Sequence, residues 1–317
     1  MKKLLALCAL VVATAAHAQS YPTRPIRIVV PFGPGGFTDV AARILQKELA
    51  PAIGQPIVIE NKPGAGSTIG TAEIANAPPD GYTLVMISTT HVISPHLYKQ
   101  MPYDPIKDFT PVMKLAEGPY VLVVHPSLGV GSVQELIALA KAKPNAVDYA
   151  SSGNGSSQHL VGALFVTMAD APLSHVPYKG SSQAMNDVLG GIVKVSFVGV
   201  PNALPNVQAG KIRALAVSTK RRYAELPNVP TLDEAGVKGF DATIWLGLLA
   251  PPNTPRDIVQ KLNASITKIL STPEARKLMA SAGVDVATST PEEFGALMQQ
   301  ELDRWGKVVR ETGATVN

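Results

Sequence analysis

The stretch IRIVVPFGPGGFTDV, residues 26–40, decides the class of fold. Its first part, Ile26–Val30, is an apolar and mostly β-branched run that ends at Pro31, which is typical of a strand buried on both faces. Glycines and a proline follow, and a helical pattern with apolar residues four positions apart begins near Thr38. A strand, a glycine-rich turn and a helix in this order predict one unit of a parallel α/β sheet.

The same alternation continues along the chain. Further strands are predicted at Ile57–Ile59, Thr83–Ile87, Val121–Val124, Val147–Ala150, His175–Tyr178, Val193–Val198, Ile212–Val217 and Thr243–Leu249. Hydroxyl residues before prolines predict helix N-caps at Thr254 and Thr272, and Thr290 with Glu293 predicts a capping box. We therefore expect an α/β fold whose mainly parallel sheets are flanked by helices.

Two positions indicate where domains meet. Gly118-Pro119 precedes the strand at Val121, and the strand Thr243–Leu249 ends just before two prolines. If both segments cross between lobes, domain 1 is discontinuous and consists of residues 19–119 and 243–317. Domain 2 is then an insert of residues 120–242, and two connecting strands form a hinge that suits closure around a ligand.

The first 18 residues are typical of a secretory signal peptide. Two lysines precede a short apolar run, and residues 16–18 have the small-x-small pattern of a cleavage site. We predict cleavage before Gln19 and a periplasmic protein. The only cysteine, Cys8, lies in this peptide, so the mature chain has no disulfide and no thiolate chemistry.

Composition and motifs argue against nucleic-acid binding and catalysis. The formal charge is +4, aromatic residues are 5%, and no basic stripe with interleaved aromatics is present. Thr38 occupies the last glycine position of a dinucleotide-binding motif, and phosphate-loop, zinc-protease and hydrolase motifs are missing. His91 and His96 flank a proline and cannot share a helical face. We expect no catalytic residue, no metal and no cofactor.

Two glycine-rich turns, residues 31–39 and 151–159, carry the chemical signal. Each follows a strand, at the carboxyl end where α/β sheets bind ligands, and each opens a helix whose N-terminus favours an anion. Either turn alone is explained by the need for glycine in tight turns. Their pairing across a cleft predicts an anion site without arginine, in which a side chain at Gly36 would fill ligand space and force an unfavourable backbone dihedral.

The chain resembles the substrate-binding proteins of tripartite tricarboxylate transporters, the Bug or TctC-type periplasmic receptors. The similar segments, given by residue number, are YPTRPI (21–26), VPFGPGGFTD (30–39), VIENKPGAG (58–66), PDGYTL (79–84), SSGNGSSQH (151–159), VPYKG (176–180), RALAV (213–217) and LPNVPT (226–231). They occur in this order, and the resemblance covers essentially the whole mature chain.

This resemblance implies a two-domain periplasmic-binding-protein fold of the second type. It also implies a receptor that captures a small organic acid in the interlobe cleft and delivers it to the membrane subunits of such a transporter. A sensor that presents the closed form to a histidine kinase is the alternative, and an exported hydrolase is a distant third. We expect a monomer.

The ligand-binding residues implied by the resemblance lie in the two turns. They are Phe32, Gly36, Phe37, Thr38, Asp39, Ser151, Gly153, Gly155, Ser156, Ser157 and His159. Ser88, Thr89 and Thr90 belong at a cleft edge by their position after the third strand, although their hydroxyls could satisfy strand-end backbone instead. His159 could likewise only cap local backbone. Phe37 stands where a small or polar residue is expected, which allows a larger or flatter apolar ligand body.

Overall fold

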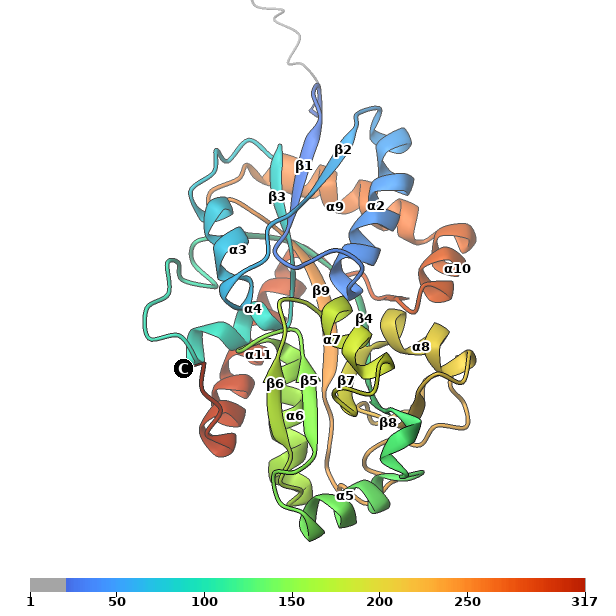
Figure 1. The fold of residues 1–317 in the computed structure, drawn as a ribbon. Coiled ribbons are helices and arrows are strands. Elements are labelled where there is room, and N and C mark those ends of the chain that lie inside the picture. The colour runs from blue at the N-terminus through green and yellow to red at the C-terminus, as the bar shows by residue number, and fades with distance from the viewer. Residues whose placement is uncertain (1–20, 317) are drawn as a thin grey trace, which may run out of the picture.

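The computed structural model describes residues 21–316 (Figure 1). The predicted signal peptide and its cleavage site before Gln19 lie outside these residues. The strands are β1 (Ile26–Val30), β2 (Ile57–Asn61), β3 (Thr83–Ser88), β4 (Thr110–Val124), β5 (Asp148–Ser151), β6 (Ser174–Pro177), β7 (Val195–Gly199), β8 (Arg213–Val217), β9 (Thr243–Ala250) and β10 (Asp285–Val286). The α-helices are α2 (Phe37–Ile53), α3 (Thr68–Ala75), α4 (Thr90–Ile93), α5 (Val133–Ala142), α6 (Ser157–Ala169), α7 (Ser181–Leu189), α8 (Val200–Gln208), α9 (Arg256–Leu270), α10 (Pro273–Ser281) and α11 (Pro291–Thr312).

The strands form one curled sheet in the order β2-β1-β3-β9-β4-β7-β5-β6, with β8 and β10 also pairing with β4. The pairs β1–β2, β1–β3, β5–β6 and β5–β7 are parallel, as predicted, whereas β4 and β9 run antiparallel to their neighbours. Helices flank the sheet, so the predicted α/β fold is confirmed (Figure 1). Figure 1 places β1, β2 and β3 in an upper half and β5 to β8 in a lower half.

Two strands join the halves. β4 pairs with β9 from Thr110 to Pro119 and with β7 from Tyr120 to Val124, so it belongs to both parts of the sheet. The prediction that this strand begins at Val121 was wrong. Its two prolines look like strand breakers in the sequence, but the pairing register shifts near Pro111, and Pro119 lies at the end of its ladder with β9. The exact domain limits stay a prediction.

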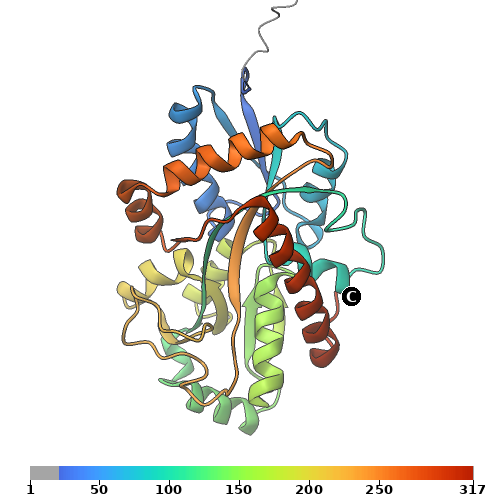
Figure 2. The ribbon, with the colours of Figure 1, turned by 180° about the vertical axis from the view of Figure 1, so that it is seen from behind.

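The last helix spans both halves from behind. Figure 2 shows α11 beside β9 and alongside α6, and α11 contacts β4, α4 and α6. Its Phe294 and Trp305 are fully buried. A Cβ at Gly247 of β9 would lie only 1.9 Å from Phe294 Cζ, so glycine is required for this helix to approach the strand.

The N-cap residues of the C-terminal helices match those predicted from the sequence, with one exception. Thr290 and Glu293 form the predicted capping box, and Thr272 accepts a hydrogen bond from the N–H of Ala275. The predicted cap at Thr254 was wrong, because α9 begins one residue later and the Thr254 hydroxyl donates to the Pro251 carbonyl at 2.8 Å. Among the helices of residues 21–316, none is both long and apolar enough to cross a membrane.

Candidate functional site

A cavity of about 450 Å³ lies between the two halves of the sheet. Its walls come from segments that follow β1, β2, β3, β5 and β6, the mutually parallel strands of each half, with additions from β7 and β9. The carboxyl ends of strands are where open α/β sheets bind their ligands. The first residues of α2, α6 and α7 line the cavity, so three helix N-termini converge on it from both halves.

Asp39 shapes the first turn from behind. It is 2% exposed, and its Oδ2 accepts hydrogen bonds from the Gly35 N–H and from Arg43 Nε, both at 2.9 Å. Its Oδ1 accepts from Asn61 Nδ2 at 2.9 Å, and the same amide also donates to the Phe32 carbonyl. Burial opposes ionisation, but these donors outweigh it and hold the pKa of Asp39 below its ordinary value. The Asp39 side chain is therefore an ionised carboxylate whose hydrogen bonds hold the turn in shape.

The second turn is built by local side-chain bonds. Ser156 is the N-cap of α6, and its hydroxyl accepts from the His159 N–H at 3.2 Å. Gly153 and Gly155 have φ of 130° and 74°, values that favour glycine. Ser151 Oγ accepts from the Gly153 N–H at 3.1 Å, which closes the turn after β5.

A stacked histidine pair supports this second turn. The rings of His159 and His175 lie 3.9 Å apart between centroids, and His175 Nε2 contacts Ser151 Oγ at 2.6 Å. Gly155 N–H donates to His159 Nδ1 at 3.3 Å, so the alternative role of His159 as a local cap is present in the structure. Burial lowers the pKa of His159 to about 4, and burial together with His159 lowers that of His175 to about 3.

The halves touch each other around the cavity, so the cleft is closed in this structure. Beside the cavity the Ser182 hydroxyl donates to the Pro34 carbonyl at 2.9 Å. The Ser157 N–H donates to Thr90 Oγ1 at 3.1 Å, and the two hydroxyls lie 3.3 Å apart. The Tyr98 hydroxyl donates to the Asn154 carbonyl at 3.4 Å.

The structure brings most of the predicted ligand-binding residues together. The cavity is lined by Phe32, Gly36, Phe37, Thr38, Ser88, Thr90, Gly153, Ser156 and Ser157. Asp39, Thr89, Ser151, Gly155 and His159 do not line it and instead bond to backbone or side chains behind the turns. Ligand contact stays a prediction for the whole set.

Sequence reasoning missed two of the wall segments. Residues 63–67 follow β2, and Lys179, Gly180 and Ser181 follow β6. The segment Gly180-Ser181-Ser182 opens a helix just as the other two turns do. Neither this segment nor residues 63–67 were assigned to a site from the sequence. Tyr98 and Ile244 also line the cavity, and no local motif marks them.

The expected dihedral strain at Gly36 was wrong. Gly36 has φ of −83° and ψ of 173°, which any residue adopts, and a Cβ there would meet Ser181 Cβ at an ordinary 3.7 Å. The constrained position is its neighbour Gly35, with φ of 78° and only 3.0 Å between a Cβ and Ser182 Oγ.

The cavity carries almost no charge. Of its lining residues between 21 and 316, only Lys179 is ionisable at neutral pH, and that residue is exposed. Within the same range no group of three or more His, Cys, Asp or Glu side chains could hold a metal ion. Anion binding here would rest on N–H groups, hydroxyls and helix N-termini.

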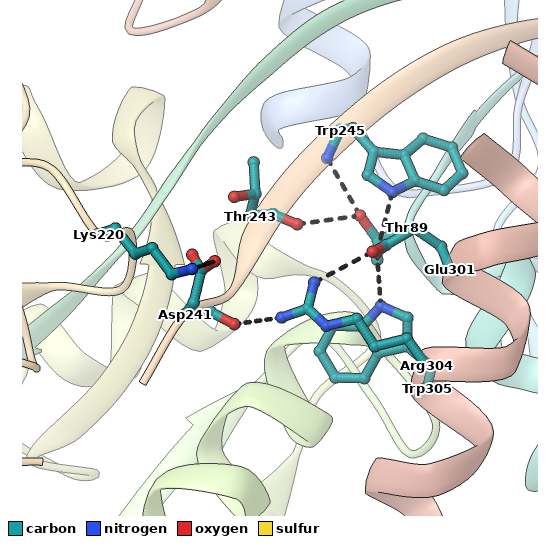
Figure 3. A network of polar contacts seen from close by, with 8 residues as sticks. All are labelled: Thr89, Lys220, Asp241, Thr243, Trp245, Glu301, Arg304 and Trp305. Atoms are coloured by element: carbon teal, nitrogen blue, oxygen red, sulfur yellow. Dashed lines mark hydrogen bonds and ion pairs between the residues drawn. The ribbon is translucent and has the colours of Figure 1, made fainter. Parts of the chain in front are cut away.

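A polar network supports the wall from the other side of β9 (Figure 3). Ile244 lines the cavity, while the next residue, Trp245, donates its indole N–H to Glu301 Oε2 at 3.4 Å, because strand side chains alternate between faces. Glu301 also accepts from Trp305 Nε1 at 3.0 Å and Arg304 Nη1 at 3.1 Å. Arg304 Nη2 donates to the Asp241 carbonyl just before β9, so α11 holds one of the two connecting strands.

Thr89 connects the same network to the cavity. Its N–H donates to the Trp245 carbonyl at 3.2 Å, and its Oγ1 accepts from the Trp245 N–H at 3.1 Å. Thr89 stands between Ser88 and Thr90, which line the cavity. The cavity wall and the back of the connecting strand are therefore one bonded unit (Figure 3).

Comparison with known proteins identifies the family. The family model described as tripartite tricarboxylate transporter family receptor, TctC, matches residues 41–314. The chain belongs to this family. The protein BugT of Bordetella pertussis is 38% identical over 321 residues, which cover 99% of this chain and 98% of BugT.

Solved structures of TctC-family proteins share the fold. The periplasmic binding protein BugD is 35% identical with a TM-score of 0.89, and the match covers 93% of this chain and 99% of BugD. The Rhodopseudomonas palustris protein Rpa4515, solved with adipate, is 36% identical with a TM-score of 0.90, over 93% and 99% of the two chains. The predicted periplasmic-binding-protein fold is thus confirmed, and these TctC relatives are solute-binding proteins, not enzymes.

Proposed function

We propose that this TctC-family protein captures a small organic acid in the cavity between its two halves. The observation that carries the proposal is the convergence of three helix N-termini, those of α2, α6 and α7, on a cavity to whose lining residues 21–316 contribute no carboxylate. Helix N-termini and free N–H groups favour a negative group. The relative solved with adipate supports a carboxylate ligand.

The fourteen predicted ligand-binding residues have two proposed roles. Those that line the cavity meet the acid directly, with Thr38 and Ser88 as candidate hydroxyl donors. Asp39, Thr89, Ser151, Gly155 and His159 hold the turns in position. The domains, residues 19–119 with 243–317 and residues 120–242, close on the acid by bending at the two connecting strands.

A thermal-shift screen tests ligand capture. The full mature chain is incubated with mono-, di- and tricarboxylates, amino acids and aromatic acids. A true ligand at 100 times its dissociation constant stabilises the folded state by about 2.7 kcal/mol, which gives a clear rise in melting temperature. If no acid raises it at millimolar concentration, and calorimetry detects no heat, the proposal is wrong.

We further propose that the monomer is exported to the periplasm with residues 1–18 removed and delivers its ligand to the membrane subunits of a tripartite tricarboxylate transporter. Intact-mass measurement on a periplasmic extract should give a chain that begins at Gln19. Proteoliposomes holding the membrane subunits should take up the acid only when the loaded receptor is added. Uptake that does not depend on the receptor would contradict delivery.

A further inference from the structure

The floor of the cavity is an aromatic ring seated on two glycines. Phe37 lines the cavity and is only 5% exposed. A Cβ at Gly118 of β4 would lie 3.6 Å from Phe37 Cε2 and Cζ. A Cβ at Gly199, the last residue of β7, would lie 3.3 Å from Phe37 Cβ and 3.4 Å from Cδ2. The ring therefore lies directly against bare backbone of two paired strands.

This seat fixes how far the ring projects into the cavity. Gly199 faces Tyr120 across the β4–β7 ladder, and Gly118 lies two residues before Tyr120, so both glycines sit where β4 passes from one half of the sheet to the other. Neither glycine has a positive φ, so backbone conformation does not require glycine at these positions. The missing side chain at Gly199 leaves room that Phe37 occupies, whereas a Cβ at Gly118 would only reach ordinary contact distance from the ring.

Part of the remaining wall is apolar, since Phe32, Pro63 and Ile244 also line the cavity. Most of the rest, among residues 21–316, consists of glycine backbone and of hydroxyl or amide side chains, which carry no charge apart from that of Lys179. The buried carboxylate behind the first turn, Asp39, is engaged by Arg43, Asn61 and the Gly35 N–H. An ammonium group carried into this space would lose its water without gaining a counter-charge, which is costly.

We propose that the cavity selects carboxylates whose body is uncharged hydrocarbon, aliphatic or aromatic, and that Phe37 on its glycine seat is the residue that sets the room for this body. The proposal rests on the proposed function, because it assigns the class of acid to the same site. The proposal excludes amino acids as preferred ligands. It also excludes compact acids, which would leave the Phe37 ring uncovered.

Calorimetric titration of the full mature chain with matched acids tests the ligand class. Adipate is compared with 2-aminoadipate, phenylacetate with phenylglycine, and both amine-free acids with succinate. In each pair the amine-free acid should bind at least tenfold more tightly, and adipate or phenylacetate should exceed succinate by at least tenfold. An amine-bearing partner that binds as tightly, or succinate as the best ligand, overturns the proposal.

The two seat glycines provide matched variants. Gly199→Ala places a Cβ in tight contact with Phe37 and should push the ring into the cavity, so affinity for the larger acid falls at least tenfold while that for succinate changes less than threefold. Gly118→Ala adds only an ordinary contact and should change both affinities less than threefold. Equal losses for both acids in Gly199→Ala would refute the role of Phe37.

Two further measurements keep the test decisive. Circular dichroism and thermal unfolding show whether Gly199→Ala folds, and if it does not, Phe37→Ala replaces it and should weaken the larger acid about tenfold more than succinate. If none of these acids binds the wild type but another carboxylate does in the wider screen, only the inferred class is wrong. If no carboxylate binds at all, the proposed function fails with it.

Discussion

At the scale of single residues, neighbouring glycines in the first turn carry different constraints. Gly35 adopts a left-handed conformation and approaches Ser182 of the opposite half, whereas Gly36 is extended and caps α2. The N–H of Gly35 is bound by Asp39. The shape of the turn thus depends on Gly35, and the space inside the cavity depends on Gly36.

The pair Gly35→Ala and Gly36→Ala separates these roles. Gly35→Ala should lower the free energy of unfolding by about 1–2 kcal/mol, the usual cost of a left-handed alanine. Gly36→Ala should change it by less than about 0.5 kcal/mol, because reduced freedom of the unfolded chain offsets a poorer N-cap. Urea denaturation of the ligand-free protein measures both, and equal effects would contradict the assignment.

Variants of Lys179 and Thr38 test how the cavity binds a negatively charged group. Both line the cavity, but Lys179 is exposed whereas Thr38 is 5% exposed at the start of α2. Thr38→Val should weaken binding of the acid found in the screen by about 0.5–3 kcal/mol, the range for one hydrogen bond to a neutral or charged group. Lys179→Ala should cost less. If calorimetry shows the reverse order, an ion pair holds the acid and the helix-end account is wrong.

At the scale of elements, the histidine pair links β6 to the N-terminus of α6. Unfolded histidines have a pKa near 6.5, whereas the folded values of His159 and His175 are about 4 and about 3. Between pH 6.5 and 4 the unfolded chain therefore binds protons that the folded chain does not. Buried His91, whose pKa is lowered to about 4, adds to the same effect.

The free energy of unfolding should accordingly fall as the pH drops from 7 to 4, by up to about 1.4 kcal/mol per pH unit for each proton taken up. His175→Gln should remove part of this slope, since one neutral buried histidine is gone. Denaturant titrations at several pH values measure the slope, and an identical slope in wild type and His175→Gln would disprove the assignment.

Sequence patterns predicted most elements because apolar strands and capped helices have strong local signals. β1, α2 and the capping box of α11 were found close to their observed positions. The first half of β4 was missed, because its prolines and charges are tolerated only through register shifts against β9. The site was predicted in part, since two turns have dense glycine and serine, whereas Tyr98 and Ile244 reach the cavity only through tertiary packing.

At the scale of the whole molecule, β4 and β9 connect the halves and α11 holds β9 from behind. Arg304 joins the Asp241 carbonyl to Glu301, so bending of the connecting strands must accommodate a helix that contacts both halves (Figures 2 and 3). The proposed bending should therefore be confined to a narrow zone between the halves, where Pro119 and Thr243 pair.

Closure around a ligand should be visible in solution. Small-angle scattering should give a smaller radius of gyration with a saturating acid from the screen than without it, because the two halves approach when the ligand joins their turns. An acid that does not raise the melting temperature serves as the control in the same buffer. An unchanged radius at saturation would indicate a rigid protein or a site confined to one half.

The bond from the Ser182 hydroxyl to the Pro34 carbonyl has a consequence for timing. It joins the two halves next to residues that line the cavity, so the proposed opening of the halves must break it. The proposed closure forms this bond only after the ligand has entered. Losing the hydroxyl would therefore shorten the residence time more than it slows association, as is usual when related complexes differ in affinity. One serine would then set how soon the two halves separate.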